Sequence, residues 1–205
     1  MIAREVARDD RPDVYPEGRY WVYRASAVGG CIRALLAARL GFNPVLPPTQ
    51  KALEIQEEAF EYGRTQESAI LDELRADGRT NQAQQYQKDN RIGYLIIRGH
   101  LDAVASKNGE RRGVEVKTAG KDRFRRFVRH GLSYTGDPVI RKWAYQVSFY
   151  MARTNLPWVV VAQERMAPEQ GRGTLHFLWL DRPPVPLLDI LRRVKTVEKL
   201  AQDGA

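Results

Sequence analysis

Residues 99–119, GHLDAVASKNGERRGVEVKTA, place charged side chains inside two apolar runs that flank a turn. The Asn-Gly pair at 108–109 favours a tight hairpin, so the two runs are predicted to be adjacent antiparallel strands. Asp102 lies in the first run, and Glu115 and Lys117 lie in the second. Charged side chains are rarely buried unless they are paired or bind a metal. This hairpin therefore constrains both the fold and the chemistry of the chain.

The hairpin belongs to a longer succession of helix and strand patterns. Strands are predicted near 82–88, 94–106, 112–118, 157–166 and 173–181, and helices near 24–42, 51–75, 121–130, 138–153 and 186–202. The first helix is expected to be capped by Ser26 and to end at Gly41, with Gly29 and Gly30 weakening its first turn. Residues 1–22 are expected to form an irregular arm, and residues 23–205 a single α/β domain with a mixed sheet.

The charge balance points to a polyanionic partner. The formal net charge is +8, and the run KDRFRRFVRH at 121–130 predicts a basic amphipathic helix. Nucleic acid is the first candidate partner and a membrane surface the second. The alternative is a basic protein with a solvated surface. The charged N-terminal stretch carries no secretion signal and no apolar run is long enough to span a membrane, so a cytoplasmic location is expected.

Side chains two residues apart on a strand share a face, so Glu115 and Lys117 are predicted to point together. The hairpin can bring Asp102 to the same face. Two carboxylates at low dielectric repel each other unless a cation joins them, and oxygen ligands suit Mg²⁺ or Mn²⁺ better than zinc. The alternative is a surface salt bridge between Glu115 and Lys117 on an edge strand.

Two helices offer further polar residues. In the helix at 51–75 an apolar stripe with i, i+3, i+4 spacing contains Glu67, and the stripe consists of Phe60, Gly63, Glu67, Ile70, Leu71 and Leu74. Glu67 either faces the buried side or lies at its rim and reaches water. In the helix at 138–153, Gln146 and Tyr150 lie one turn apart and share a face. The alternative for this pair is a core tyrosine and a surface glutamine.

Taken together, these segments resemble the PD-(D/E)XK nuclease superfamily, in its RecB-like and lambda-exonuclease-like branch that is common in phages. Five segments match in the family's order: YRASAVGGCIRALLAARLG as the Ser…Cys-x-Arg helix, FEYGRTQE as the Gly-x-x-x-Glu helix, GHLDAV, VEVKT as Glu-x-Lys, and YQVSFY as Gln-x-x-x-Tyr. The resemblance covers residues 23–165. It implies a restriction-endonuclease-like core, in which a mixed central sheet is flanked by helices.

The resemblance also implies roles for single residues. Asp102 and Glu115 would ligate Mg²⁺, for which Mn²⁺ would substitute, with help from the Val116 carbonyl and from Glu67 directly or through water. Lys117 would orient the attacking water. The residues expected to contact DNA are Arg24, Ser26, Arg33, Gln146, Tyr150, Lys121 and Arg125, of which Arg33, with Ser26 and Arg24, would grip phosphate.

One departure from the family matters. Some relatives hold an iron–sulfur cluster with four cysteines, but Cys31 is the sole cysteine here, so no such cluster is expected and Cys31 is interpreted as a packing residue. The predicted function is a metal-dependent DNA nuclease, with an exonuclease favoured over an endonuclease. The alternatives are a non-catalytic DNA-binding or assembly protein on this fold, and an RNA-processing enzyme. A homo-oligomer or a recombination-protein partner is possible, and no membrane partner is expected.

Overall fold

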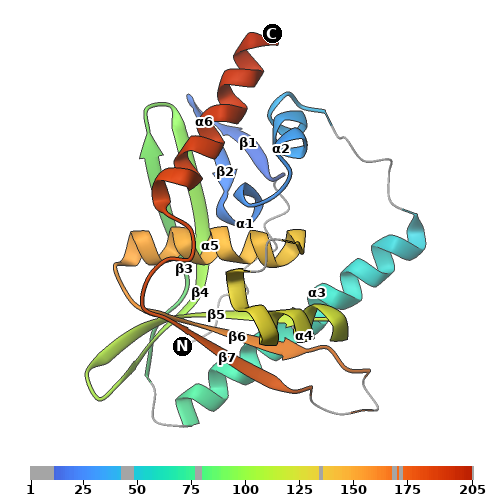
Figure 1. The fold of residues 1–205 in the computed structure, drawn as a ribbon, viewed down its shortest axis with the longest axis vertical. Coiled ribbons are helices and arrows are strands. Elements are labelled where there is room, and N and C mark those ends of the chain that lie inside the picture. The colour runs from blue at the N-terminus through green and yellow to red at the C-terminus, as the bar shows by residue number, and fades with distance from the viewer. Residues whose placement is uncertain are drawn as a thin grey trace.

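The computed structural model describes residues 12–42, 49–76, 80–133, 136–167, 170 and 173–204 (Figure 1). Its strands are β1 (Val14–Glu17), β2 (Tyr20–Arg24), β3 (Thr80–Ile92), β4 (Leu95–Lys107), β5 (Glu110–Ala119), β6 (Trp158–Glu164) and β7 (Leu175–Leu180). Its α-helices are α1 (Ala25–Val28), α2 (Ile32–Arg39), α3 (Gln50–Ala76), α4 (Lys121–His130), α5 (Pro138–Thr154) and α6 (Leu187–Asp203), and a 3₁₀ turn η1 covers Gly131–Ser133.

The seven strands form one mixed sheet in which β4 has three neighbours. β3 pairs along one edge of β4. The other edge is shared: β2 runs parallel to residues 95–98, and β5 runs antiparallel to residues 103–107. Residues 99–102 lie between these two pairings, so the sheet forks there. β5 continues past the fork in parallel with β6, and β7 follows antiparallel to β6.

Helices cover the two faces of the sheet unequally. α3 packs on one face, where Ile70 and Leu71 meet small aliphatic side chains of β4, β5 and β6. The other face carries the larger core, to which α1, α2, α4, α5 and α6 all contribute. Figure 1 shows α5 crossing in front of the sheet and α3 running behind it. Because successive side chains of a strand point to opposite faces, Val114 and Val116 of β5 face α3, whereas Glu115 and Lys117 face α5.

The structure confirms the mixed α/β fold and the Asn-Gly hairpin between β4 and β5. Asn108 and Gly109 both have positive φ, as a tight hairpin of this kind requires. No helix within the described residues is both long and apolar enough to cross a membrane.

The N-terminal predictions need three corrections. Within the predicted arm of residues 1–22, residues 14–17 and 20–22 are not irregular, because β1 and β2 join the sheet beside β4; residues 1–11 lie outside the described part of the chain. The predicted first helix is two helices, since it breaks at Gly29 and Gly30. Arg24, not Ser26, is the N-cap of α1, and no side chain caps that helix.

Two side chains are more exposed than predicted. Cys31 is exposed at the N-cap of α2, so it is not a packing residue. Phe60 is 53% exposed although it continues the apolar stripe of α3. The stripe is buried only from Ile70 and Leu71, where α3 crosses the sheet.

Candidate active site at the fork of the sheet

The fork places Asp102 opposite Glu115. The last cross-strand pair of the hairpin joins Ala103 to Val114, so continuing the register by one step sets residue 102 against residue 115 on the same face. β5 has already turned away from β4 at this point. The amide of Val116 therefore donates to the carboxylate Oδ2 of Asp102, at 2.7 Å, instead of to a strand carbonyl. One acid thus satisfies the backbone at the fork while lying beside a second acid.

Lys117 links this acidic pair to α5. Its Nζ donates to Oε1 of Glu115 and, at 3.1 Å, to Oε1 of Gln146. The Glu115 side chain is fully buried and the Lys117 side chain is 17% exposed. The ammonium group therefore lies beside a fully buried carboxylate, while part of the Lys117 side chain reaches the surface.

The site carries more negative charge than Lys117 can balance. Burial, and then repulsion by Asp102, raise the pKa of Glu115 to about 8. Burial also raises the pKa of Asp102, against the opposing effects of Lys117 and the Val116 amide. Burial alone would lower the pKa of Lys117, but the attraction of Glu115 and Asp102 outweighs it and raises that pKa. Asp102 and Glu115 would therefore both be ionised more readily if a second positive charge lay beside them in addition to Lys117.

One oxygen of the site has no hydrogen bond. Oε2 of Glu115 is buried and accepts no hydrogen bond from the described residues. An orphaned buried carboxylate oxygen beside a second carboxylate fits a hard divalent cation. In the described part of the chain no three His, Cys, Asp or Glu side chains are grouped as metal ligands, so Asp102 and Glu115 are the two carboxylates that could hold such an ion directly.

Glu67 approaches from α3. Its side chain is half-buried, so it is neither enclosed with the buried side of the helix nor fully exposed to water. Its charge raises the pKa of both Glu115 and Lys117, so it belongs to the electrostatic surroundings of the site. A Cβ added at Gly63, one turn earlier, would lie 3.6 Å from Oγ1 of Thr118, which is ordinary contact, so close packing does not require glycine there.

Gln146 and Tyr150 differ in exposure. Gln146 is half-buried and reaches Lys117, whereas Tyr150 is 1% exposed. The Tyr150 hydroxyl accepts from Nε2 of Gln146 at 3.0 Å and donates to the carbonyl of His100 at 2.7 Å. The predicted contact between Tyr150 and DNA is therefore corrected: the hydroxyl is enclosed, and the alternative of a core tyrosine holds. The contribution of His100 to this hydrogen bond is its main-chain carbonyl.

The basic helix α4 begins immediately beyond the site, at Lys121. Phe124 and Phe127 are buried in the core, so they are packing residues. Asp137, which caps α5 by accepting from the amides of Val139 and Ile140, also pairs with Arg123 and Arg126. Further basic side chains lie on the exposed surface of this helix, namely Lys121, Arg125, Arg129 and His130.

Arg24 is the N-cap of α1, Ser26 lies on α1, and Arg33 lies on α2. Figure 1 shows α1 and α4 on opposite sides of α5. Ser26 and Arg33 are exposed, and Arg24 is half-buried.

The Gly29–Gly30 turn between α1 and α2 is fixed by two arginines that were not predicted as functional residues. Arg141 donates to the Gly29 carbonyl at 3.1 Å. Arg193 donates to the carbonyls of Val28 and Gly30.

Asp137 and Arg193, which were not predicted as functional residues, differ in whether the local sequence indicates their roles. Asp137 precedes Pro138, and an acid followed by proline is a common helix start, so its capping role was visible in the sequence. Arg193 had no local signal, because its partners lie 163 and 165 residues away in the chain.

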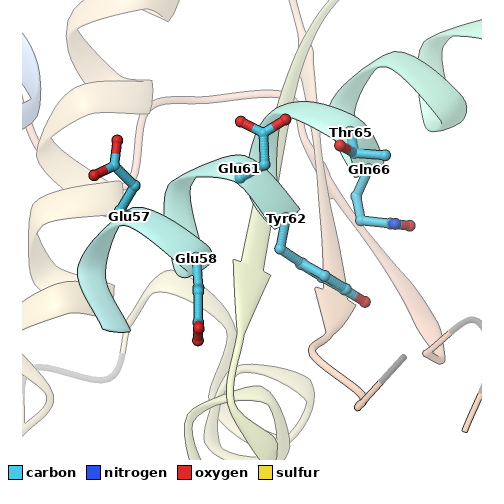
Figure 2. A pocket seen from close by; sticks show the side chains of 6 residues that line it. All are labelled: Glu57, Glu58, Glu61, Tyr62, Thr65 and Gln66. Atoms are coloured by element: carbon cyan, nitrogen blue, oxygen red, sulfur yellow. The ribbon is translucent and has the colours of Figure 1, made fainter. Parts of the chain in front are cut away.

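Two surface hollows among the described residues lack this combination of groups. One, of about 500 Å³, is lined by α3 alone, and Figure 2 shows Glu57, Glu58 and Glu61 projecting from that helix. A second, of about 400 Å³, is mainly apolar, with Phe177 and Trp179 in its wall. The first would repel an anionic substrate, and the second holds no acid–lysine cluster.

Comparison with known proteins establishes the fold. No family model and no curated protein sequence matches this chain. Among solved structures, the protein SSO0001 superimposes with a TM-score of 0.56 at 14% identity, over 91% of this chain and 78% of that one. An alkaline exonuclease, LHK-Exo from Laribacter hongkongensis, gives a TM-score of 0.50 at 14% identity, over 88% of each chain. The chain thus has the α/β fold of an alkaline exonuclease.

Proposed function

We propose that this protein is a metal-dependent DNA nuclease of the RecB-like and lambda-exonuclease-like branch of the PD-(D/E)XK superfamily. The observation that carries the proposal is the acidic pair at the fork, where a buried oxygen of Glu115 has no partner among the described residues and Lys117 stands beside it. The structural likeness to an alkaline exonuclease supports the same interpretation.

Asp102 and Glu115 would hold the metal, with the Val116 carbonyl and Glu67 assisting. Oxygen donors of this kind suit Mg²⁺, and Mn²⁺ should substitute for it. A divalent cation at such a site lowers the pKa of a bound water and draws charge from a phosphoryl oxygen. The orphaned oxygen of Glu115 and the mutual repulsion of the two acids are the features of this chain that a cation would relieve.

The remaining work falls to the chain's own residues. Lys117 has three N–H donors, of which two point to Glu115 and Gln146, and the third suits a water or a phosphate oxygen. The exposed Lys121 and Arg125 on α4, and Arg33 with Ser26 and Arg24 on the other side of α5, would bind backbone phosphates. Contacts with phosphate position DNA without reading its sequence, so we expect binding to be sequence-tolerant and sensitive to salt.

The test compares end-labelled linear DNA with closed circular DNA, each with Mg²⁺, Mn²⁺ or chelator. We expect linear DNA to be degraded from its ends with either metal, circular DNA to survive, and chelator to stop the reaction. Cleavage of the circle would replace the exonuclease by an endonuclease, and preference for RNA in a parallel assay would change the substrate.

A matched pair of variants makes this test specific. Lys117→Met removes the ammonium group at the fork, and Lys195→Met removes one from the exposed surface of α6. We expect the first to abolish cleavage and the second to retain it. If the wild-type protein binds DNA but cleaves nothing with either metal, the chain is a non-catalytic DNA-binding protein and the proposal fails.

A further inference from the structure

Tyr150 lies behind the candidate site. Its ring stacks on Trp158, with centroids 5.3 Å apart, and its hydroxyl packs so close to Gly99 that a Cβ there would lie 2.9 Å from it. A side chain that is 1% exposed cannot touch DNA outside the protein. Any part it takes in the reaction must therefore pass through its neighbours.

The hydrogen bonds around Tyr150 have a fixed direction. The His100 carbonyl lies in the stretch of β4 between the residues that pair with β2 and those that pair with β5. A carbonyl can only accept a hydrogen bond. The Tyr150 hydroxyl donates its one proton to that carbonyl, so it can only accept from Gln146. Nε2 of Gln146 must then face Tyr150, which turns Oε1 toward the ammonium group of Lys117.

We propose that Tyr150 is a positioning residue that, through Gln146, holds Lys117 in its working place beside Glu115. The chain of contacts runs from β4 through α5 to β5, so it links the two strands of the fork, as the bond from the Val116 amide to Asp102 also does. The proposal rests on the proposed nuclease activity, because it assigns Tyr150 a part in that reaction.

Removing the Tyr150 hydroxyl removes the anchor of Gln146. Nε2 would lose its acceptor, so the side chain would no longer be held with Oε1 against Lys117. Lys117 would be held by Glu115 alone and would spend part of its time displaced. Positions that orient a catalytic group cost about 10- to 100-fold in activity when they are lost. DNA affinity should not change, since the hydroxyl is enclosed.

The kinetic test uses Tyr150→Phe, Gln146→Leu, the double variant, and Tyr145→Phe as a control. Tyr145 is on the same helix, with its ring under Arg193 and outside this chain of contacts. We expect Tyr150→Phe to lower kcat about tenfold with KM unchanged, Gln146→Leu to lower kcat at least as far, and the double variant to match Gln146→Leu. Losses that multiply, or a rise in KM for Tyr150→Phe alone, would overturn the proposal.

A second measurement does not depend on activity. In the NMR spectrum of isotope-labelled protein, the two side-chain amide protons of Gln146 can be assigned by their loss in Gln146→Leu. We expect Tyr150→Phe to shift or broaden them and Tyr145→Phe to leave them in place. If the wild-type protein proves inactive on DNA and these signals still respond as expected, the contact chain stands and the nuclease assignment fails. If Tyr150→Phe folds and leaves the signals unchanged, the positioning role is wrong.

Discussion

Strand β4 carries two charge clusters close together in sequence, and they are built in opposite ways. Around Arg98, the guanidinium donates to Asp89 through Nε at 3.0 Å and Nη2 at 2.9 Å, to both oxygens of Glu17, and to the Tyr15 hydroxyl at 3.3 Å. Beside Asp102 lies a second buried acid, Glu115, and Oε2 of Glu115 accepts no hydrogen bond from the described residues. Only the first cluster satisfies the hydrogen-bonding groups of its buried member.

The comparison distinguishes a structural charge cluster from a functional one. The acids beside Arg98 raise its pKa, so it stays charged at every pH the protein meets, and its partners keep some contact with water. The acids beside Lys117 outnumber it, and burial, followed by repulsion from Asp102, raises the pKa of Glu115. Buried charges left short of a partner cost stability. Such a shortage at a fork in the sheet supports the proposal that this position is reserved for a cation.

The largest effect should come from Asp102→Asn. Asparagine keeps an oxygen that can accept from the Val116 amide, so the fork stays closed while one negative charge is lost. We expect cleavage to fall at least about 10³-fold, as when a member of a catalytic group is removed. DNA binding in chelator should persist, and the melting temperature should stay or rise, because repulsion with Glu115 is relieved. Retained cleavage would remove Asp102 from the site.

The same change in the other cluster should reverse the outcome. Asp89→Asn removes the charge that accepts two bonds from Arg98 and leaves the guanidinium with Glu17 as its one acidic partner among the described contacts. We expect the free energy of unfolding to fall by about 1–3 kcal/mol, measured by urea denaturation, with cleavage by the folded protein unchanged. A loss of cleavage without a loss of stability would show that the two clusters are not separate.

A smaller effect separates the clusters by pH. In the unfolded chain Glu115 ionises near its ordinary pKa of 4.5, and in the folded, metal-free protein near 8. Between these values the folded state holds a proton that the unfolded state has lost, so stability falls as pH rises. One group contributes at most about 1.4 kcal/mol per pH unit. Denaturation in chelator at pH 5 to 8 should show this slope.

Glu115→Gln and Asp89→Asn test whether Glu115 is the group that causes the slope of stability against pH. Glu115→Gln should flatten it, and Asp89→Asn should shift the whole curve down while leaving its slope unaltered. An identical slope in wild type and Glu115→Gln would show that the folded protein already ionises Glu115 as readily as the unfolded chain does. The raised pKa, and the shortage of positive charge that it reflects, would then be absent.

The two clusters also differ in how far a sequence reveals them. Asp102, Glu115 and Lys117 could be placed on one face from the amino-acid sequence alone, because the Asn-Gly turn sets the register and the strand period of two does the rest. Arg98 could not be paired, since Glu17 lies 81 residues away in a segment predicted to be an irregular arm. β1 contains Pro16 and spans only Val14–Glu17, which is too short for a periodic signal.

Burial was similarly beyond local pattern. The stripe of α3 predicted one continuous buried face, but which of its turns meets the sheet depends on where β4 to β6 end, and Phe60 lies outside that contact. Tyr150 and Gln146 share a helix face, as predicted, yet their unequal exposure follows from Gly99 and Trp158, which belong to other strands. Periodicity fixes faces, whereas depth is set by tertiary packing.

The smallest effects should come from charges that belong to neither cluster. Lys121 and Arg125 are exposed on α4, beside the site, and each is expected to neutralise one phosphate. Each change to alanine should reduce the slope of log affinity against log salt by about 0.9 and weaken binding a few-fold at moderate salt. The measurement is the fluorescence anisotropy of a labelled duplex in chelator, titrated at several salt concentrations. Lys195→Ala removes an equal charge from α6 and should leave the slope unchanged. An equal loss from α4 and α6 would mean that DNA responds to the net charge of the protein and not to a track that leads to Asp102.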